Sequence, residues 1–289
     1  MTPPGMLVTD FDGTLRNTRK TIGERDLETL RRLGREGYVR TIATGRSLHS
    51  LFRAIDGSFP VDYVLFSSGA GVLDFARNRI IRSSRLARAV IHRAARLLQR
   101  MGLDFMVHLP IPENHRFLYH ASGRENPDFE ARRRIYEGHG SLWSEGGNDL
   151  SHGSQIVVIE PPSVQPSSLE TLRARLSECS VIRATSPLDG ESRWIEIFPS
   201  GISKGDTADW LAGEVGLGSE SCMAVGNDYN DLDLLEWAGR SFVVAEAPEE
   251  LRRRFEVVAP SVEAGVSDAV HRWLIRAPVQ TDSGSTSRE

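Results

Sequence analysis

Two aspartates one residue apart follow an apolar stretch near the start of the chain, and this feature constrains the fold most strongly. Residues 7–15 read LVTDFDGTL. The apolar beginning predicts the end of a buried strand, and Gly13 permits a sharp turn directly after it. Open α/β sheets bind ligands at the carboxyl ends of their strands, so we expect Asp10 and Asp12 to lie at such an edge.

Asp10 and Asp12 alternate with Phe11, so in an extended segment both carboxylates point the same way while Phe11 points into the protein. Two carboxylates this close repel each other unless something positive shares the space. A hard divalent cation with oxygen ligands, most simply Mg²⁺, supplies that charge. A simpler interpretation stays open, because Asp-Gly is a common turn pair that can end a strand without any chemistry.

Three further motifs follow in order along the chain: Thr44-Gly45-Arg46, Lys204-Gly205, and residues 226–231, which read GNDYND. Together with residues 10–15, they resemble the four motifs of the haloacid dehalogenase superfamily of phosphohydrolases. The resemblance covers residues 6–75 and 195–265 in round numbers and is closest to the Cof-like, sugar-phosphatase-like branch. It implies an α/β fold with a Rossmann-like, mostly parallel sheet flanked by helices.

The second motif, Thr44-Gly45-Arg46, follows residues 38–43, which predict the next parallel strand. The resemblance implies that Thr44 donates its hydroxyl to a phosphoryl oxygen, although a threonine here also suits a helix N-cap. Gly45 and Arg46 are then expected to bind substrate. Arg46 fits the surface of a helix equally well.

Lys204 opens a predicted helix that extends to residue 215, with Ser203 as its N-cap. The helix dipole disfavours a cation in the first turn, so an exposed lysine gains nothing from this position. An isolated lysine is usually a surface residue. The place of Lys204 between the second and fourth motifs implies instead that it faces a phosphate and Asp10, where it neutralises negative charge.

The fourth motif departs from the family pattern, which commonly reads Gly-Asp-x-x-Asn-Asp. Asn227 stands where the first aspartate belongs, whereas Asn230 and Asp231 match. Either the Asn227 carbonyl binds Mg²⁺ with weaker charge, or Asp228 binds it after a local shift. We favour Asp228, because a carboxylate holds Mg²⁺ better than an amide does.

We expect Asp231 to act through water or to orient a ligand, although a first-turn acid would also explain it, and Asn230 to bind substrate. The expected metal ligands are Asp10, Asp12, Asp228 or Asn227, and Asp231. The expected catalytic residues are Asp10, Asp12, Thr44 and Lys204.

The chain changes character between the second and third motifs. An apolar helical face over residues 86–101, a helix at 169–178 and strands at 155–160 and 194–198 predict an α+β module. The resemblance implies a large cap that excludes water and selects the substrate. We expect the core at 1–81 and 196–276, the cap at 82–195 and a disordered tail at 277–289.

The sequence singles out no specificity residue in the cap. Its histidines lack metal-ligand spacing and indicate exposed or structural roles. Arg132, Arg133 and Arg134 indicate a solvated helix face. Trp194 indicates packing, with stacking on a sugar ring as the alternative. Ser68 replaces the asparagine usual in the Cof-like branch, which leaves that contact at the site entrance open.

Composition narrows the partners. The formal net charge of -4 provides no basic field for nucleic acid. No apolar run approaches the roughly 20 residues of a membrane span. Cys179 and Cys222 are far apart and predict free thiols in a reducing compartment. The first six residues resemble no export leader, so we expect a cytoplasmic protein whose partner is a small phosphorylated metabolite.

The motifs therefore predict a Mg²⁺-dependent phosphatase of a small phosphomonoester, with sugar phosphates favoured. In this hypothesis Asp10 forms an aspartyl-phosphate and Asp12 acts as acid and base. Three alternatives stay open: a phosphomutase with the same intermediate, a receiver-like signalling module, which the large insertion does not suit, and a non-catalytic sensor, suggested by Asn227 and Ser68. Glycerate-type and cofactor phosphates remain open as substrates, and the sequence predicts no oligomeric state.

Overall fold

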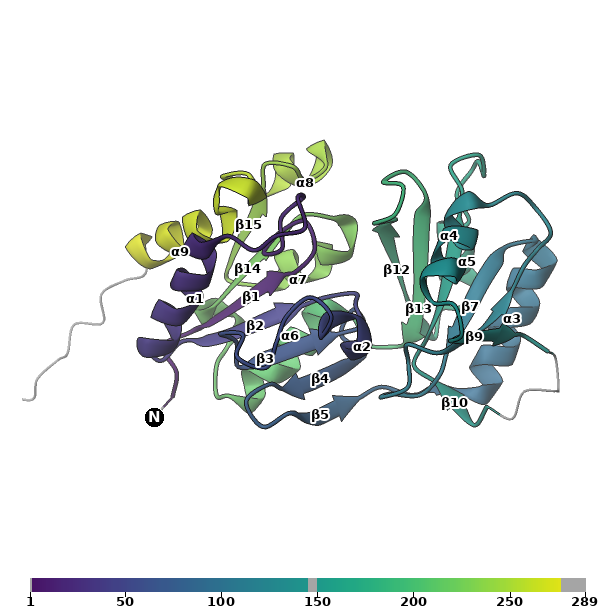
Figure 1. The fold of residues 1–289 in the computed structure, drawn as a ribbon, viewed down its shortest axis with the longest axis horizontal. Helices are drawn as coiled ribbons and strands as arrows, with labels where there is room; N and C mark the ends of the chain where they lie inside the picture. Colours follow the sequence, from purple (N-terminus) through teal and green to yellow (C-terminus); the bar gives the residue numbers. More distant parts are fainter. Residues whose placement is uncertain (1, 145–149, 277–289) are drawn as a thin grey trace, which may run out of the picture.

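The computed structural model describes residues 2–144 and 150–276 and shows two modules side by side (Figure 1). The first is an α/β core, and the second is an α+β cap inserted into it. The expected fold class, a Rossmann-like α/β core with an inserted cap, is confirmed. The expected tail at 277–289 lies outside the described residues.

The core is built on an eight-stranded sheet in the order β16-β15-β14-β1-β2-β3-β4-β5. Its parallel part contains β1 (Met6–Asp10), β2 (Val39–Ala43), β3 (Tyr63–Phe66), β14 (Cys222–Gly226), β15 (Arg240–Val244) and β16 (Glu256–Val258). At one edge, β4 (Gly71–Asp74) and β5 (Arg79–Ser83) add an antiparallel hairpin.

Helices cover both faces of this sheet. Leu7 of β1 packs in the cluster that includes side chains of α1 (Glu24–Arg35), α2 (Leu48–Leu51) and α9 (Gly265–Arg276). Met6 and Val8 point the other way, into a cluster with α6 (Lys204–Glu214), α7 (Leu232–Trp237) and α8 (Glu249–Arg254). Because both faces are apolar, the polar residues at the strand ends are directed to the edge of the sheet.

The cap contains a six-stranded sheet in the order β12-β13-β11-β7-β8-β9. Its strands are β7 (Asp104–His108), β8 (Phe117–His120), β9 (Gly140–Leu142), β11 (Gln155–Glu160), β12 (Cys179–Thr185) and β13 (Arg193–Pro199). One face packs against α3 (Arg88–Met101) and α5 (Leu169–Arg175). The other face carries α4 (Pro127–Ile135). On this face, Phe198 of β13 packs against Ala70 of the core.

The chain passes between the modules slightly later than the sequence suggests. β5 stays in the core sheet to Ser83, and the short pair β6 (Leu86–Ala87) and β10 (His152–Gly153) belongs to the cap side. β13 pairs with cap strands as far as Pro199, so it belongs wholly to the cap sheet. The expected boundaries at 81/82 and 195/196 therefore fall inside β5 and β13.

Cys179 and Cys222 are free thiols, as predicted. Within residues 2–144 and 150–276, no helix has the length and apolarity needed to cross a lipid bilayer.

Candidate active site

Asp10 ends β1 at the carboxyl edge of the parallel sheet, between β2 and β14. The chain turns directly after it: the Arg16 backbone N–H donates to the Phe11 carbonyl at 2.7 Å. Gly13 has a φ of +85°, and a Cβ there would lie 2.4 Å from the Asn227 amide nitrogen. Glycine therefore provides both the turn and the space that brings the 226–231 loop against Asp10.

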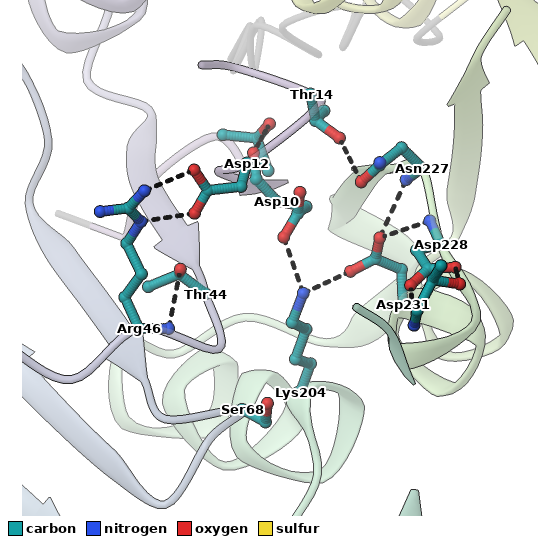
Figure 2. Close-up of polar contacts among 12 residues, drawn as sticks. Asp10, Asp12, Thr14, Thr44, Arg46, Ser68, Lys204, Asn227, Asp228 and Asp231 are labelled. Atoms are coloured by element: carbon teal, nitrogen blue, oxygen red, sulfur yellow. Dashed lines mark hydrogen bonds and ion pairs between the residues drawn. The ribbon is translucent and has the colours of Figure 1, made fainter. Parts of the chain in front are cut away.

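Lys204 lies at the centre of the site, between two carboxylates (Figure 2). Its Nζ donates to Asp10 Oδ1 at 2.7 Å and to Asp231 Oδ1 at 2.5 Å, and the lysine is fully buried. It begins α6, whose N-cap Ser203 accepts a hydrogen bond from the Asp206 backbone N–H, as predicted. Burial alone would lower the pKa of Lys204, but the two carboxylates raise it above its usual range.

The environment of Asp10 disfavours its charged form. Burial, followed by repulsion from Asp231, outweighs the attraction of Lys204 and raises the pKa of Asp10 to about 7. Two buried carboxylates face one ammonium, so the group as a whole is short of positive charge. Such a deficit is what a bound cation relieves.

The side chain of Asp12 is held by two arginines. Arg46 donates from Nε to Oδ2 at 2.5 Å and from Nη2 to Oδ1 at 2.8 Å, and Arg16 donates to Oδ1 at 3.1 Å. The Arg46 guanidinium also lies over the Phe11 ring, 5.5 Å from its centroid. Arg46 therefore fixes the orientation of Asp12, a role that neither of its sequence-based interpretations included.

Thr44 and Gly45 follow β2 at the same edge. Thr44 is 1% exposed, and its hydroxyl oxygen accepts a hydrogen bond from the Arg46 backbone N–H at 3.1 Å. The N-cap of the following helix α2 is Ser47, so Thr44 does not cap that helix. Gly45 is exposed, and Ser68 Oγ lies beside it, 3.5 Å from where a Cβ would be.

Asn227 lies beside Asp10, whereas Asp228 is turned to the cap (Figure 2). One end of the Asn227 amide lies 3.0 Å from Asp10 Oδ2, 3.2 Å from the Asp12 carbonyl and 3.1 Å from Thr14 Oγ1. Asp228 accepts hydrogen bonds from the backbone N–H and hydroxyl of Thr185, on β12, at 2.7 and 2.9 Å. This geometry favours Asn227 as the group near a cation, against our sequence-based preference for Asp228, because both Asp228 oxygens are bonded elsewhere.

Asp231 orders the loop that presents Asn227. It is fully buried, and its Oδ2 accepts from the backbone N–H groups of Asn227 at 2.9 Å and Asp228 at 3.1 Å. A Cβ on Gly226 would lie 2.6 Å from the Cβ of Asp231, so glycine is required there. Asn230 is half-buried, and no hydrogen bond joins its side chain to another residue of the described chain.

The oxygen atoms around Asp10 suit a hard divalent cation, and together they carry little negative charge. An octahedral Mg²⁺ site with bonds of about 2.0–2.1 Å places neighbouring oxygens about 3 Å apart. With its oxygen toward Asp10, the Asn227 amide provides this spacing to Asp10 Oδ2 (3.0 Å) and the Asp12 carbonyl (3.2 Å). With the amide turned over, its nitrogen donates to the same oxygens. Within the described residues, no three His, Cys, Asp or Glu side chains form a metal cluster.

Glu196 is a site residue that the sequence-based reasoning missed. It projects from β13, is 4% exposed, and its Oε2 accepts a hydrogen bond from the Ser68 hydroxyl at 2.6 Å. Burial raises the pKa of Glu196. A signal was available, since a lone glutamate in the run WIEIF, residues 194–198, is an unusual residue for a buried strand.

The fold and these motifs define a haloacid dehalogenase-like hydrolase, and the chain belongs to that family: the family's sequence model matches residues 7–270. Among curated proteins, HMP-PP phosphatases from Yersinia pseudotuberculosis and Klebsiella pneumoniae are each 24% identical to this chain. Each alignment covers 92% of this chain, and 93% and 94% of the two relatives.

Solved structures support the same fold. The subclass IIB sugar phosphatase BT4131 aligns with a TM-score of 0.73 at 20% identity, covering 94% of this chain and 99% of that chain. The phosphatase BT1666 from Bacteroides thetaiotaomicron aligns with a TM-score of 0.76 at 20% identity, covering 94% of this chain and 95% of that chain. The match of the family's sequence model over residues 7–270 confirms the resemblance to the haloacid dehalogenase superfamily, and these structures agree with it in fold.

Proposed function

We propose that this chain is a Mg²⁺-dependent phosphatase that hydrolyses a small phosphomonoester, with sugar phosphates as the favoured class, through an aspartyl-phosphate on Asp10. The buried group of Asp10, Lys204 and Asp231 at the carboxyl edge of the sheet carries this proposal. The names of the relatives, HMP-PP phosphatase and sugar phosphatase, support phosphoryl chemistry.

Asp10 is the proposed nucleophile. Attack of its carboxylate on phosphorus forms a new P–O bond and breaks the bond to the leaving alkoxide, which divides one difficult displacement into two. Lys204 holds Asp10 Oδ1 at 2.7 Å, which fixes the orientation of the carboxylate. The same ammonium and the hydroxyl of Thr44 stabilise negative charge on the transferred group.

Asp12 is the proposed acid and base. It protonates the leaving alkoxide and later removes a proton from the water that attacks the aspartyl-phosphate. Both arginines that contact Asp12 limit its carboxylate to one orientation next to Asp10. Gly45, Arg46 and Asn230 remain proposed substrate-binding positions, with Arg46 acting chiefly through Asp12.

Mg²⁺ would be held by Asp10 Oδ2, the Asp12 carbonyl and the Asn227 amide oxygen, and when bound it supplies positive charge between Asp10 and the phosphoryl group. Asn227 contributes no charge to this set. We therefore expect weaker Mg²⁺ binding than a site with a second carboxylate would show.

The cap contacts this edge at several points. Thr185 donates to Asp228 at 2.9 Å, Ser68 donates to Glu196 at 2.6 Å, and the Asn114 amide donates to Ser67 Oγ at 2.7 Å. These contacts between cap and core favour exclusion of water during phosphoryl transfer and suit a small metabolite better than a folded protein.

Phosphate release from p-nitrophenyl phosphate tests the proposal. The wild-type protein should release phosphate with Mg²⁺ and lose this activity with a chelator. Asp10→Asn should abolish turnover without altering the circular dichroism spectrum, whereas Asp56→Asn, on an exposed loop, should leave turnover unchanged. Activity retained by Asp10→Asn contradicts the assignment of Asp10 as nucleophile. With a sugar phosphate as the substrate, an isomerised sugar phosphate without free phosphate would favour a phosphomutase.

A further inference from the structure

A group of buried polar side chains on the cap has fewer partners than its burial requires. We call this group the cap polar cluster. His108, Asn114, Gln155 and Glu196 are each 3–5% exposed, and Arg132 is half-buried, with a buried Nε. The cap polar cluster therefore consists of His108, Asn114, Arg132, Gln155 and Glu196, and none of these residues belongs to the four motifs.

The cap polar cluster faces the active site. Glu196 bonds to Ser68 of the core, and Asn114 bonds to the adjacent Ser67. Glu196 is also close enough to interact electrostatically with both Lys204 and Arg132. The cluster therefore lies across the interface from the ammonium that holds Asp10.

Arg132 forms no ion pair in the described part of the chain, although the carboxylates of Glu196 and Asp128 attract it from a longer distance. Its guanidinium makes one long hydrogen bond, to His108 Nε2 at 3.5 Å, and its Nε is buried without a partner. His108 supplies no negative charge. The guanidinium stacks on the rings of Trp194 and Tyr136, 4.3 and 5.4 Å from their centroids. Stacking stabilises the cation but leaves its Nε–H donor unsatisfied.

Two unsatisfied acceptors lie around His108, the hydrogen-bond partner of this arginine. Asn114 Oδ1 and Gln155 Oε1 are both buried without a hydrogen bond. Gln155 pairs with His108 across β11 and β7, and His108 Nδ1 bonds to the Asn114 carbonyl at 2.7 Å. Buried polar groups without partners are costly, so this combination of a cation with two acceptors requires a ligand that complements both.

We propose that Arg132 binds a second anionic group of the substrate, a phosphate or carboxylate distinct from the phosphoryl group that reacts, while Asn114 and Gln155 accept hydrogen bonds from neighbouring hydroxyls. This inference rests on the proposed phosphatase function and specifies its substrate class: a hydroxylated phosphomonoester with a second anion. The planar guanidinium of arginine suits either anion, because it can donate two parallel hydrogen bonds.

Matched substrates that differ in the second anion test this proposal. Fructose 1,6-bisphosphate is compared with fructose 6-phosphate for a second phosphate, and 3-phosphoglycerate with glycerol 3-phosphate for a carboxylate. The wild-type kcat/KM should be at least about tenfold higher for the bis-anionic member of one pair, as expected for hydrogen bonds to a charged group. The pair that shows the preference identifies the second anion.

Variants assign the preference to Arg132. Arg132→Gln should reduce the preference at least about tenfold, and Arg132→Lys, which retains the charge without the planar donor set, should retain part of it. Arg134→Gln is the matched control, because Arg134 is exposed on the same helix. Circular dichroism and thermal melting verify that each variant folds.

A binding measurement separates failure of this inference from failure of the phosphatase proposal. Calorimetry of Asp10→Asn and of Asp10→Asn/Arg132→Gln, with Mg²⁺ and each of the four compounds, reports anion preference without turnover. Preference for a bis-anionic compound that Arg132→Gln removes supports the inference even if no compound is hydrolysed. Equal binding and equal kcat/KM within both pairs, or a preference that Arg132→Gln leaves intact, overturns it while the phosphatase proposal stands on phosphate release.

Discussion

The substitution Asn227→Asp tests the role of Asn227, which stands where the family pattern has an aspartate. The substitution places a carboxylate about where the amide lies, 3.0 Å from Asp10 Oδ2. Two like charges about 4 Å apart repel by roughly 4 kcal/mol at an effective dielectric constant of about 20. The variant also loses an amide nitrogen that can donate to Asp10, Asp12 and Thr14, at about 1 kcal/mol for each hydrogen bond.

Relaxation of the loop and protonation of one carboxylate reduce these figures, so we expect the free energy of unfolding without metal to fall by about 2–4 kcal/mol. With saturating Mg²⁺ the new carboxylate becomes a ligand, and the stability should return to the wild-type value or exceed it. The Mg²⁺ dissociation constant should fall at least about tenfold, because a full charge replaces an amide dipole.

Urea unfolding in chelator and in Mg²⁺, together with calorimetric titration of Mg²⁺, measures both effects. Asn230→Asp is the matched control: it makes the same charge change in the same loop, but no hydrogen bond joins Asn230 to Asp10 in the described structure. If Asn227→Asp is as stable as the wild type in chelator and binds Mg²⁺ no more tightly, the amide does not lie at the cation position.

Three further predictions follow from buried charges and their partners. Lys204→Met leaves Asp10 and Asp231 without their ammonium, so the free energy of unfolding should fall by about 3–5 kcal/mol. Adding Asp231→Asn should recover part of this loss, and no recovery would contradict the pairing. Arg46→Lys removes the two-pronged contact with Asp12, so kcat should fall at least about tenfold in steady-state assays, and an unchanged kcat would exclude a positioning role. Burial lowers the pKa of His108 from 6.5 to about 3. Between these two pH values the folded protein binds fewer protons than the unfolded chain, so the free energy of unfolding falls as the pH falls, by up to about 1.4 kcal/mol per pH unit. His108→Gln should flatten this dependence in urea unfolding at pH 6.5 and 4.5, whereas His152→Gln should not, and equal slopes for all three proteins would refute the assignment.

Elements with strong local signals were predicted well. The strand expected at residues 155–160 is β11, Gln155–Glu160, and the helix expected to begin at Lys204 is α6, Lys204–Glu214. The hairpin of β4 and β5 was missed, because the glycine and serine residues before it indicate only a break in the chain. The strand β12 was also missed, since its mixed sequence CSVIRAT depends on pairing with β13 for its structure.

The candidate site shows the same division between local and tertiary information. The motifs correctly indicated which residues follow the strand ends, because turns and strand edges are encoded locally. The partner of each side chain is set by contacts between distant segments: Asp228 bonds to Thr185 of the cap. Arg132 was predicted on a solvated helix face and is instead stacked on Trp194, a contact that helical spacing alone does not reveal.

The central claim is that Asp10 carries the phosphoryl group during turnover. The most direct measurement is acid quenching of the wild-type protein during hydrolysis of a phosphomonoester with Mg²⁺, followed by mass spectrometry of its peptides. We predict phosphate attached to the peptide that contains Asp10, and none in Asp10→Asn. Turnover without any phosphorylated peptide, or phosphate attached to a different residue, would contradict the account.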